Sequence, residues 1–316
     1  MRFTKSLPNL FTSLFTKKKQ VVVIVGPTAS GKSSLAIEIA KQHNGEVISC
    51  DSRQIYKGLE IFSGAVTPET NGGVKHHLVS FLQPGEIYSA DRFVKETIPI
   101  IDMLHGQNKL PIIAGGTGFW AQAFMYQKNM PAVEPDYPFR ETLEQYSTEE
   151  LFGMLQEQDP RRSKLADPHN RKRIVRALEI IKEIGSVPVL RDVTRRGYSF
   201  VFVYLKPEKE LLDNRITQNV SQRMKQGLLE ESKKALNGLS RTQIEELGLG
   251  FKNLYDLREG MINEDEFAEL MAREEIKYAK RQKTFINKLY KKYKGRKVEI
   301  TEIDLQDRIS QVSHFL

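Results

Sequence analysis

The sequence predicts an α/β fold in which a parallel sheet is flanked by helices and interrupted by a mostly helical insertion. Two observations lead to this prediction. Short apolar runs rich in Val and Ile alternate with segments of helical periodicity, as in parallel sheets covered on both faces. Between Gln127 and Arg196 these runs disappear, and Pro-containing loops are followed by helical patterns. A chain of 316 residues is long enough for one large α/β domain with an insertion, or for two domains.

The apolar runs place the strands, and the helical patterns fall between and after them. We expect strands at residues 21–25, 46–49, 110–114 and 200–205, and a first helix at residues 33–41. The insertion, residues 128–196, should contain helices at 140–146, 148–158 and 170–184, the second of them capped by Thr148. Long helices are expected at 208–236 and 264–290, so that residues 21–127 and 197–316 form the sheet domain.

The first 20 residues differ from the rest of the chain, because they are basic, rich in Ser and Thr, and contain no acidic residue. One interpretation is an organelle transit peptide or a helix that lies on a membrane surface. We favour the alternative interpretation, which is a disordered basic extension or a start codon assigned too far upstream.

The amino-acid composition indicates which kinds of partner and compartment this protein is suited to. Lys and Arg outnumber Asp and Glu by 48 to 40, which gives a formal charge of +8 and favours a nucleic-acid partner. The single cysteine, Cys50, is expected to be a small core residue, and its isolation indicates a reducing, cytoplasmic compartment. No apolar run approaches the length of a membrane span. His76 and His77 are adjacent, so their side chains should diverge rather than share a metal ion.

Residues 26–33 match the phosphate-loop pattern G-x-x-x-x-G-K-[ST] between a predicted strand and a predicted helix, which is typical of a P-loop NTPase-like core. The loop glycines let backbone N–H groups surround an anion, and the helix adds its positive N-terminal end. Lys32 supplies charge for phosphate oxygens, and the Ser33 hydroxyl is placed to hold Mg²⁺. We expect a nucleotide phosphate or another diphosphate to be bound by Gly26, Pro27, Thr28, Ala29, Ser30, Gly31, Lys32 and Ser33.

Asp51 follows the second predicted strand directly, at the sheet edge where ligands bind in open α/β folds. A carboxylate that faces a phosphate loop can contact Mg²⁺ or act as a general base, whereas a simpler interpretation is a cap of a helix or loop. Another predicted strand ends in GGTG at residues 115–118, whose glycines permit close approach of a ligand. By itself this short pattern is equally typical of a turn.

Two segments carry clustered basic side chains. Residues 170–176 place Lys172 and Arg176 on one helical face with Arg173 beside them, and Lys280 with Arg281 repeats the pattern. Such charge runs form either solvated helix faces or contacts with the phosphate backbone of a nucleic acid. The pattern alone leaves both interpretations open.

Taken together, these motifs resemble the tRNA dimethylallyltransferase (isopentenyltransferase) family over about residues 20–295. A phosphate loop occurs in many unrelated proteins, whereas this loop followed by DSxQxY and GGTG is far more specific. The similar segments are GPTASGKS at 26–33, DSRQIYKGLEI at 51–61, HHL at 76–78, YSADRF at 88–93, IIAGGTGFW at 112–120, DPRR at 159–162, NRKRIVRALEI at 170–180, LGFK at 249–252 and AKRQ at 279–282.

The resemblance implies transfer of a dimethylallyl group from dimethylallyl diphosphate to the exocyclic N6 amine of the adenosine 3′-adjacent to the anticodon of tRNA. It implies Asp51 as the general base, Thr117 along the passage of the base, and Lys32 with Mg²⁺ opposite the leaving diphosphate. It further implies a monomer that binds the tRNA anticodon stem-loop through Asp51, Ser52, Arg53, Gln54, Thr117, Arg140, Lys172, Arg173, Ile174, Val175, Arg176, Leu247, Gly250, Phe251, Lys252, Lys280 and Arg281.

The chain departs from the family pattern at several positions. Where the family has Gly-Thr-x-Lys, this chain has Phe62 to Ala65, so that a glycine and a lysine are absent. Asn219 replaces an arginine implicated at the diphosphate, and Arg223, one helical turn further, is the expected substitute. Phe285 replaces a tryptophan. Two alternative functions therefore remain, a small-molecule P-loop kinase and a catalytically weakened tRNA-binding relative.

Overall fold

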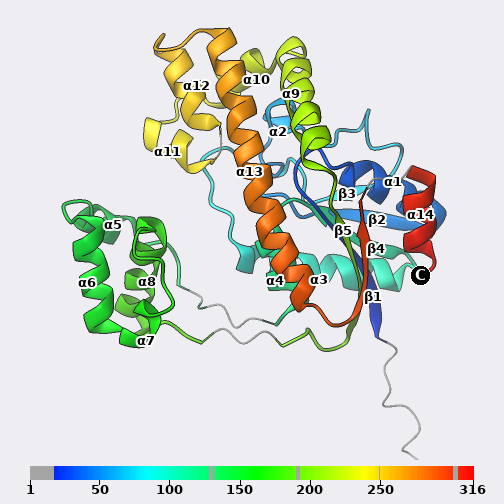
Figure 1. Cartoon of the computed structure of the whole chain (residues 1–316), viewed down its shortest axis with the longest axis horizontal. Helices are drawn as coiled ribbons and strands as arrows, with labels where there is room; N and C mark the ends of the chain where they lie inside the picture. Colours follow the sequence, from blue (N-terminus) through cyan, green and yellow to red (C-terminus); the bar gives the residue numbers. More distant parts are fainter. Residues whose placement is uncertain (1–17, 128–130, 132, 190–192, 249, 302–304) are drawn as a thin grey trace, which may run out of the picture. The chain divides into compact units, whose positions relative to one another are not determined.

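Figure 1 shows the computed structural model, which describes residues 18–127, 131, 133–189, 193–248, 250–301 and 305–316. The described chain divides into two compact units. Unit 1 combines the described residues up to Met125 with Arg195–Leu316, and unit 2 spans Tyr126–Thr194. The predicted basic extension lies outside the described residues except for its last three positions.

Unit 1 is built from parallel strands and the helices that connect them. Its strands are β1 (Lys19–Val25), β2 (Gly45–Ser49), β3 (His76–His77), β4 (Leu110–Gly115), β5 (Tyr198–Leu205) and β6 (Arg296–Ile300). Its helices are α1 (Lys32–Gln42), α2 (Glu60–Ser63), α3 (Ala90–Gly106), α4 (Gly118–Met125), α9 (Lys209–Lys225), α10 (Leu228–Ala235), α11 (Arg241–Glu246), α12 (Phe251–Arg258), α13 (Glu264–Lys292) and α14 (Leu305–Ser313). Figure 1 shows α10, α11 and α12 gathered at one end of this unit, whereas α1 and α14 lie side by side next to the sheet.

All paired strands of the sheet are parallel, in the order β3-β2-β4-β1-β5-β6. The register places Val22 of β1 beside Ile112 of β4 and beside Val201 of β5. The prediction of a parallel sheet flanked by helices is therefore confirmed. Because the strands run the same way, the carboxyl ends of β1, β2 and β4 meet at one sheet edge, where ligands bind in such folds.

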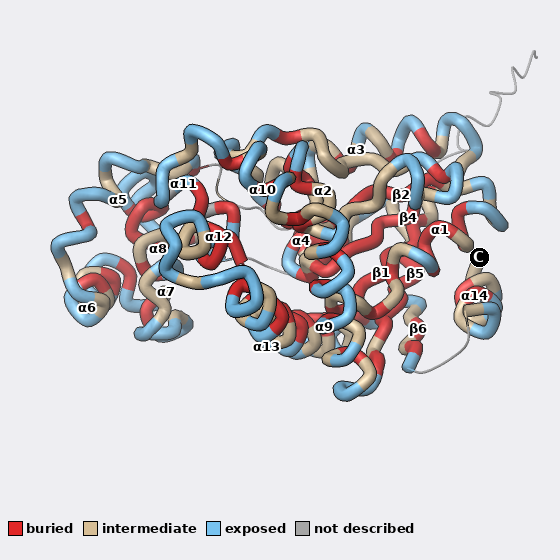
Figure 2. The backbone as a smooth tube through the Cα atoms, turned by 90° about the horizontal axis from the view of Figure 1, so that it is seen from above, coloured by how far each residue is buried: buried red, intermediate tan, exposed pale blue. Residues whose placement is uncertain are grey.

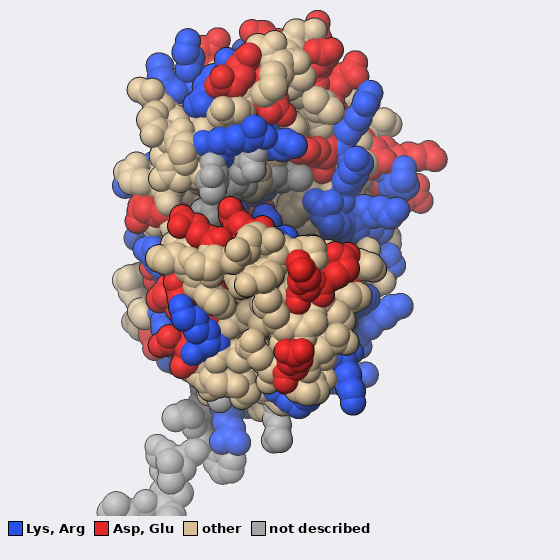
Figure 3. All heavy atoms as spheres, turned by 90° about the vertical axis from the view of Figure 1, so that its left-hand side faces the viewer, with Lys and Arg blue, Asp and Glu red and all other residues tan. Residues whose placement is uncertain are grey.

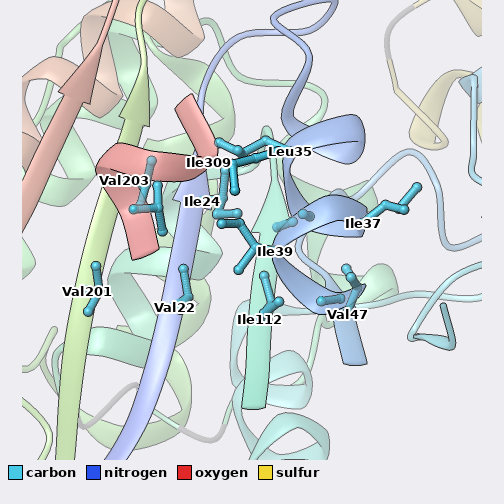
Figure 4. Close-up of a cluster of buried hydrophobic side chains, with 14 of the residues drawn as sticks. Val22, Ile24, Leu35, Ile37, Ile39, Val47, Ile112, Val201, Val203 and Ile309 are labelled. Atoms are coloured by element: carbon cyan, nitrogen blue, oxygen red, sulfur yellow. The ribbon is translucent and has the colours of Figure 1, made fainter. Parts of the chain in front are cut away.

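A core of aliphatic side chains joins the sheet to α1 and α14. Figure 4 shows Val22, Ile24 and Ile112 of the central strands in one cluster with Leu35 of α1 and Ile309 of α14. Each of these side chains is at most 3% exposed. Figure 2 shows the same burial along the central strands. Strands covered on both faces have continuous apolar sequences, which is why these strands could be predicted.

Two strands were missed by the sequence analysis. β3 contains only two residues, His76 and His77, so it has no apolar run. β6 is an edge strand in which Val298 and Ile300 alternate with charged residues that face away from the core. Short and edge strands of this kind carry little of the pattern that identifies a buried strand.

Several predicted boundaries also differ from the structure, and two of the differences have a clear cause. β1 begins at Lys19 rather than residue 21, because Lys19 and Gln20 still pair with Tyr198 and Ser199 of β5. The single helix expected at 208–236 is divided into α9 and α10 by Gly227, whose φ of 94° lies in the left-handed region. A residue in that conformation ends a helix, and glycine adopts it without strain.

Unit 2 contains the helices α5 (Tyr137–Leu143), α6 (Thr148–Gln158), α7 (Pro160–Ser163) and α8 (Arg171–Ile184). Its own core includes Leu151 and Leu155 of α6 and Ile174 and Leu178 of α8. In each helix the two residues are four positions apart, so each helix presents an apolar stripe. Among the described residues, no helix has both the length and the apolar character that a bilayer crossing requires.

Helix α6 begins with a capping box in which the predicted cap, Thr148, is already the first helical residue. The Ser147 hydroxyl accepts a hydrogen bond from the Glu150 backbone N–H at 3.2 Å. In return the Glu150 carboxylate accepts one from the Ser147 backbone N–H at 2.7 Å. The prediction was therefore wrong by one residue, because Ser and Thr are both good caps and stand next to each other.

We expect Ser147→Ala to destabilise the start of α6 by about 1 kcal/mol, because one of the two reciprocal hydrogen bonds is lost. Amide hydrogen exchange in residues 148–152 should then accelerate by about fivefold. Thr148→Ala alters the neighbouring position and serves as the matched control, with an acceleration below about twofold. Equal acceleration in the two variants would contradict the assignment of Ser147 as the cap.

Candidate active site

The phosphate loop connects the carboxyl end of β1 to the first residue of α1. Gly31 precedes the helix with a φ of 85°, a conformation that would strain any side chain. Lys32 is buried, and its Nζ donates a hydrogen bond to the Pro27 carbonyl oxygen at 2.6 Å. Burial lowers the pKa of Lys32 to about 8, although the nearby Asp51 carboxylate opposes this effect. The lysine therefore loses its charge only slightly above neutral pH.

A cavity of about 820 Å³ lies against this loop. Its walls come from the loop, from the ends of β2 and β4, and from α9, α13 and α14. The predicted site residues that line it are Thr28, Ala29, Gly31, Lys32, Ser33, Asp51, Arg53, Gln54 and Arg223. The predicted residues Gly26, Pro27, Ser30, Ser52 and Thr117 belong to the same segments but do not line the cavity.

The structure brings Asp51 and the GGTG segment together at the ends of the neighbouring strands β2 and β4. Asp51 Oδ1 accepts a hydrogen bond from the Arg53 backbone N–H at 3.1 Å, and Oδ2 accepts one from the Gly116 backbone N–H at 3.3 Å. A Cβ atom at Gly116 would lie 2.3 Å from the Gln282 amide nitrogen, so any side chain there would displace the Gln282 amide. Two backbone amides thus orient the carboxylate in the cavity wall.

Thr117 is hydrogen-bonded to the segment that carries Asp51. Its hydroxyl oxygen accepts from the Ser52 backbone N–H at 2.9 Å and donates to the Ser52 hydroxyl at 3.2 Å. The Thr117 backbone N–H donates to the Cys50 carbonyl oxygen at 3.1 Å. Cys50 is fully buried, as predicted for a core residue, and burial raises the pKa of its thiol well above the ordinary value. Thr117 therefore fixes the position of the chain around Asp51.

Gln282 of α13 connects the phosphate loop to the end of β4. Its side-chain oxygen accepts a hydrogen bond from the Thr28 backbone N–H at 2.9 Å, and its side-chain nitrogen donates to the Gly116 carbonyl oxygen at 3.0 Å. The side chain is buried, so both contacts are shielded from water. Gln282 belongs to the AKRQ segment, but the sequence analysis assigned it no role.

Glu275 of α13 lies between two buried arginines. Its Oε1 lies 2.9 Å from Nη2 of Arg53, and its Oε2 lies 2.9 Å from Nη2 of Arg223. Burial by itself raises the pKa of Glu275, but the two guanidinium groups outweigh this effect and hold the pKa below its ordinary value. The three side chains form a buried Arg–Glu–Arg triad, which carries one net positive charge.

Arg223 also contacts groups outside the triad. Besides its contact with Glu275, Arg223 donates from Nη1 to the Phe62 carbonyl oxygen at 2.6 Å and from Nε to the Asn219 carbonyl oxygen at 3.2 Å. All three nitrogens of the guanidinium group are thus engaged within the protein. Arg223 ties α9 to α13 and α2 and also lines the cavity, and its contact with a diphosphate stays a prediction.

The predicted tRNA-binding residues of unit 1 fall into two groups. Leu247 and Phe251 are buried, and Phe251 packs on the Phe62 ring with 4.2 Å between the ring centroids. Gly250 lies against the same ring, because a Cβ there would be 3.2 Å from the Phe62 Cζ atom. Gly250 and Phe251 therefore act through packing on Phe62, whereas Leu247 is simply buried. The exposed residues of this set are Lys252, Lys280 and Arg281.

In unit 2, two of the predicted arginines contact one buried carboxylate. Arg140 Nε lies 2.6 Å from Glu179 Oε1, and Arg176 Nη1 lies 3.0 Å from Glu179 Oε2. Although burial raises the pKa of Glu179, hydrogen bonds from Arg140 and Arg176 hold it below its ordinary value. The glutamate was not predicted, and it fixes the orientation of both arginines.

The remaining predicted residues of α8 differ in exposure. Ile174 is fully buried in the core of unit 2, so its side chain supports the helix and cannot reach a ligand. Val175 packs partly against the same core. Lys172 and Arg173 are exposed. On the face of the molecule drawn in Figure 3, Lys and Arg side chains form groups rather than an even mixture with Asp and Glu.

Oxygen atoms suited to a divalent cation lie in the cavity. Ser33 and Asp51 both line it, and Mg²⁺ is commonly held by such oxygens together with phosphate oxygens and water. The described residues contain no group of three or more His, Cys, Asp or Glu side chains arranged around a metal ion. His76 Nδ1 lies 2.9 Å from the Val74 carbonyl oxygen, whereas His77 Nε2 lies 2.6 Å from Glu46, so the two rings have separate partners.

The sequence of this chain is similar to that of a known protein family. A family model described as IPP transferase matches residues 54–289, which is more than half of the chain. The chain belongs to the IPP transferase family. Its matched range includes GGTG, Glu275 and Gln282. For Glu275 and Gln282, two of the residues that sequence reasoning missed, the available signal was a Glu and a Gln seven positions apart on the apolar face of one helix.

Individual relatives cover nearly the whole chain. A tRNA dimethylallyltransferase of Halalkalibacterium halodurans is 33% identical over 308 residues, covering 95% of this chain and 97% of the relative. Another from Geobacillus kaustophilus is 37% identical over 275 residues, covering 84% and 87%.

Solved structures of this family share the fold. The full-length tRNA isopentenylpyrophosphate transferase from Bacillus halodurans matches with a TM-score of 0.69 at 33% identity, over 94% of this chain and 95% of the other. A eukaryotic dimethylallyltransferase acting on tRNA matches with a TM-score of 0.79 at 27% identity, over 94% and 77%.

In this IPP transferase family member, Glu275→Gln should lower the free energy of unfolding of unit 1 by about 3 kcal/mol, because two buried arginines lose their counter-charge. Urea unfolding can be followed through the fluorescence of the single tryptophan, Trp120 of α4, which is buried in the same unit. Glu274→Gln, at the neighbouring position, is the control and should change the free energy by less than about 0.5 kcal/mol. A loss below about 1 kcal/mol in Glu275→Gln would contradict the triad.

The pKa of Lys32 can be measured directly. In protein labelled with ¹³C at lysine Cε, one resonance should titrate with a midpoint near pH 8 and be absent from Lys32→Met. Asp51→Asn should move this midpoint to lower pH, because the aspartate stabilises the charged lysine. A midpoint at the ordinary lysine value, or a shift to higher pH in Asp51→Asn, would contradict this description of the loop.

Proposed function

We propose that this chain transfers a dimethylallyl group from dimethylallyl diphosphate to the exocyclic N6 amine of the adenosine 3′-adjacent to the anticodon of tRNA, giving N6-isopentenyladenosine. The observation that carries the proposal is the Asp51 carboxylate, held by two backbone amides in a cavity that the phosphate loop also lines. The names of the relatives, tRNA dimethylallyltransferases, support the same reaction.

In the proposed reaction the bond between the allylic carbon and the diphosphate oxygen breaks, and a C–N bond to the adenosine amine forms. The amine is a poor nucleophile because its lone pair is conjugated with the purine ring, and it must lose a proton as the new bond forms. Asp51 accepts this proton. The diphosphate leaves with growing negative charge, which Lys32 and the amides of the phosphate loop stabilise.

In this proposal, the Ser33 hydroxyl would help to hold Mg²⁺ at the phosphate loop. When bound, the ion supplies positive charge that neutralises the leaving group. Ser33 and Asp51 offer only oxygen atoms to the cavity, which fits a hard cation better than a soft one.

The tRNA substrate must present its adenosine outside the stacked anticodon loop, because the Asp51 carboxylate lies in a cavity wall and cannot reach a stacked base. Arg53 and Gln54 line the same cavity beside Asp51 and are proposed to contact the flipped base. Exposed Lys172 and Arg173 of unit 2 are proposed to contact stem phosphates, a mode that reads shape rather than sequence. The net charge of +8 supports a nucleic-acid partner, and we propose that the protein acts as a monomer in the cytoplasm.

Asp51→Ala should abolish prenyl transfer, while the affinity for tRNA stays within about tenfold of that of the unaltered protein. The assay combines the protein with dimethylallyl diphosphate, Mg²⁺ and unmodified tRNA, and measures N6-isopentenyladenosine in nuclease digests by mass spectrometry. Asp265→Ala, an exposed aspartate in the first turn of α13, is the control and should keep full activity.

Three outcomes of this experiment would overturn parts of the proposal. Full activity of Asp51→Ala would exclude its role as the base. Binding of tRNA by the unaltered protein without product would indicate a catalytically weakened relative. If the unaltered protein neither binds tRNA nor forms the product, and instead phosphorylates a small metabolite with ATP, the protein would be a kinase.

A further inference from the structure

Helix α14, near the end of the chain, is anchored to the helix that follows the phosphate loop. Ile309 and Val312 of α14 are buried in the same aliphatic cluster as Leu35 of α1. Figure 4 shows Ile309 next to Leu35 in this cluster. A further hydrogen bond joins Ser313 Oγ to His43 Nε2 at 2.9 Å. The middle and the C-terminal end of α14 are therefore fixed relative to α1.

This anchoring brings Arg308 to the phosphate loop. A Cβ atom built on Gly31 would lie 3.1 Å from Arg308 Nη1, so the guanidinium group lies directly against the loop backbone. Arg308 and Leu305 are one helical turn apart, and both line the cavity that Lys32 and Ser33 also line. No sequence motif links positions 31 and 308, and the resemblance assigned Arg308 no function.

We infer that Arg308 is a ligand of the diphosphate group bound in the phosphate loop, acting beside Lys32. The guanidinium group stays charged at all physiological pH values and presents several N–H donors in a planar fork that matches two phosphate oxygens. This inference rests on the proposed function, because it takes the leaving diphosphate as the anion. It adds a ligand from the C-terminal helix to a site otherwise built from the loop.

The side chains that line the cavity carry a net positive charge. Among the described residues, those that line the cavity include two carboxylates, Asp51 and Glu275. They also include five cationic side chains: Lys32, Arg53, Arg215, Arg223 and Arg308. Arg53 and Arg223 are already bound to Glu275. Lys32 lies under the influence of Asp51 and donates to the Pro27 carbonyl oxygen. Arg308 places a further positive charge at the cavity, on the α14 side of the loop.

The test is a calorimetric titration of the full chain with inorganic diphosphate at about 0.1 M salt. Arg308→Gln should weaken binding by about tenfold, because a charge-assisted contact is lost. Arg273→Gln removes the same charge from an exposed position of α13 outside the cavity, and it should bind diphosphate as the unaltered protein does. Normal binding by Arg308→Gln would overturn the inference and leave the proposed function intact. No binding by the unaltered protein would remove both.

A second measurement needs no variant, so it applies even where Arg308→Gln fails to fold. Phenylglyoxal modifies accessible arginines, and mass spectrometry reports each position separately. Saturating inorganic diphosphate should slow the modification of Arg308 by about fivefold or more, whereas the modification of Arg273 should not change. Equal rates at Arg308 with and without diphosphate, under conditions where calorimetry detects binding, would overturn the inference.

Discussion

The carboxylate of Glu275 holds together three segments that are far apart in the sequence. Arg53 follows β2, Arg223 lies near the end of α9, and Glu275 itself lies in the middle of α13. The three side chains are at most 10% exposed. Removing such charges from water costs several kcal/mol per ion, which only close and well-oriented contacts offset. The triad is therefore stable in one arrangement, and that arrangement fixes three walls of the cavity.

The same helix also positions the phosphate loop. Gln282 lies seven residues after Glu275 on the buried face of α13, and it binds both the Thr28 backbone and the Gly116 carbonyl oxygen. The Gly116 N–H in turn orients the Asp51 carboxylate. One helix thus sets the distance between the Asp51 carboxylate and the phosphate loop. This explains why a long helix far along the sequence belongs to a site that begins at residue 26.

The sequence allowed the local parts of this site to be predicted, because their signals are contiguous. The phosphate loop follows an apolar strand, and Asp51 follows another, so both could be placed at one sheet edge. The partners of Arg223 could not be predicted, because Glu275 is 52 positions away and only the packing of α9 on α13 brings them together. Arg308 is a stronger example, since its approach to Gly31 depends on how α14 folds back onto α1. The hydrophobic periodicity of a sequence indicates which face of a helix is buried, but not which residue of another element contacts that face.

The contacts of Phe62 give a physical reason for one departure from the family pattern. Phe62 is fully buried and stacks on Phe251, and its carbonyl oxygen binds Arg223. A glycine at this position would leave a cavity beside Phe251. The aromatic pair therefore holds the α2 segment against α12, while the Phe62 carbonyl oxygen contacts Arg223 of α9. Arg223 is engaged by Phe62, Asn219 and Glu275 and also lines the cavity, so its expected role in place of Asn219 stays a prediction. Arg215 on α9 and Arg308 on α14 also line the cavity, so cationic side chains stand on either side of the phosphate loop.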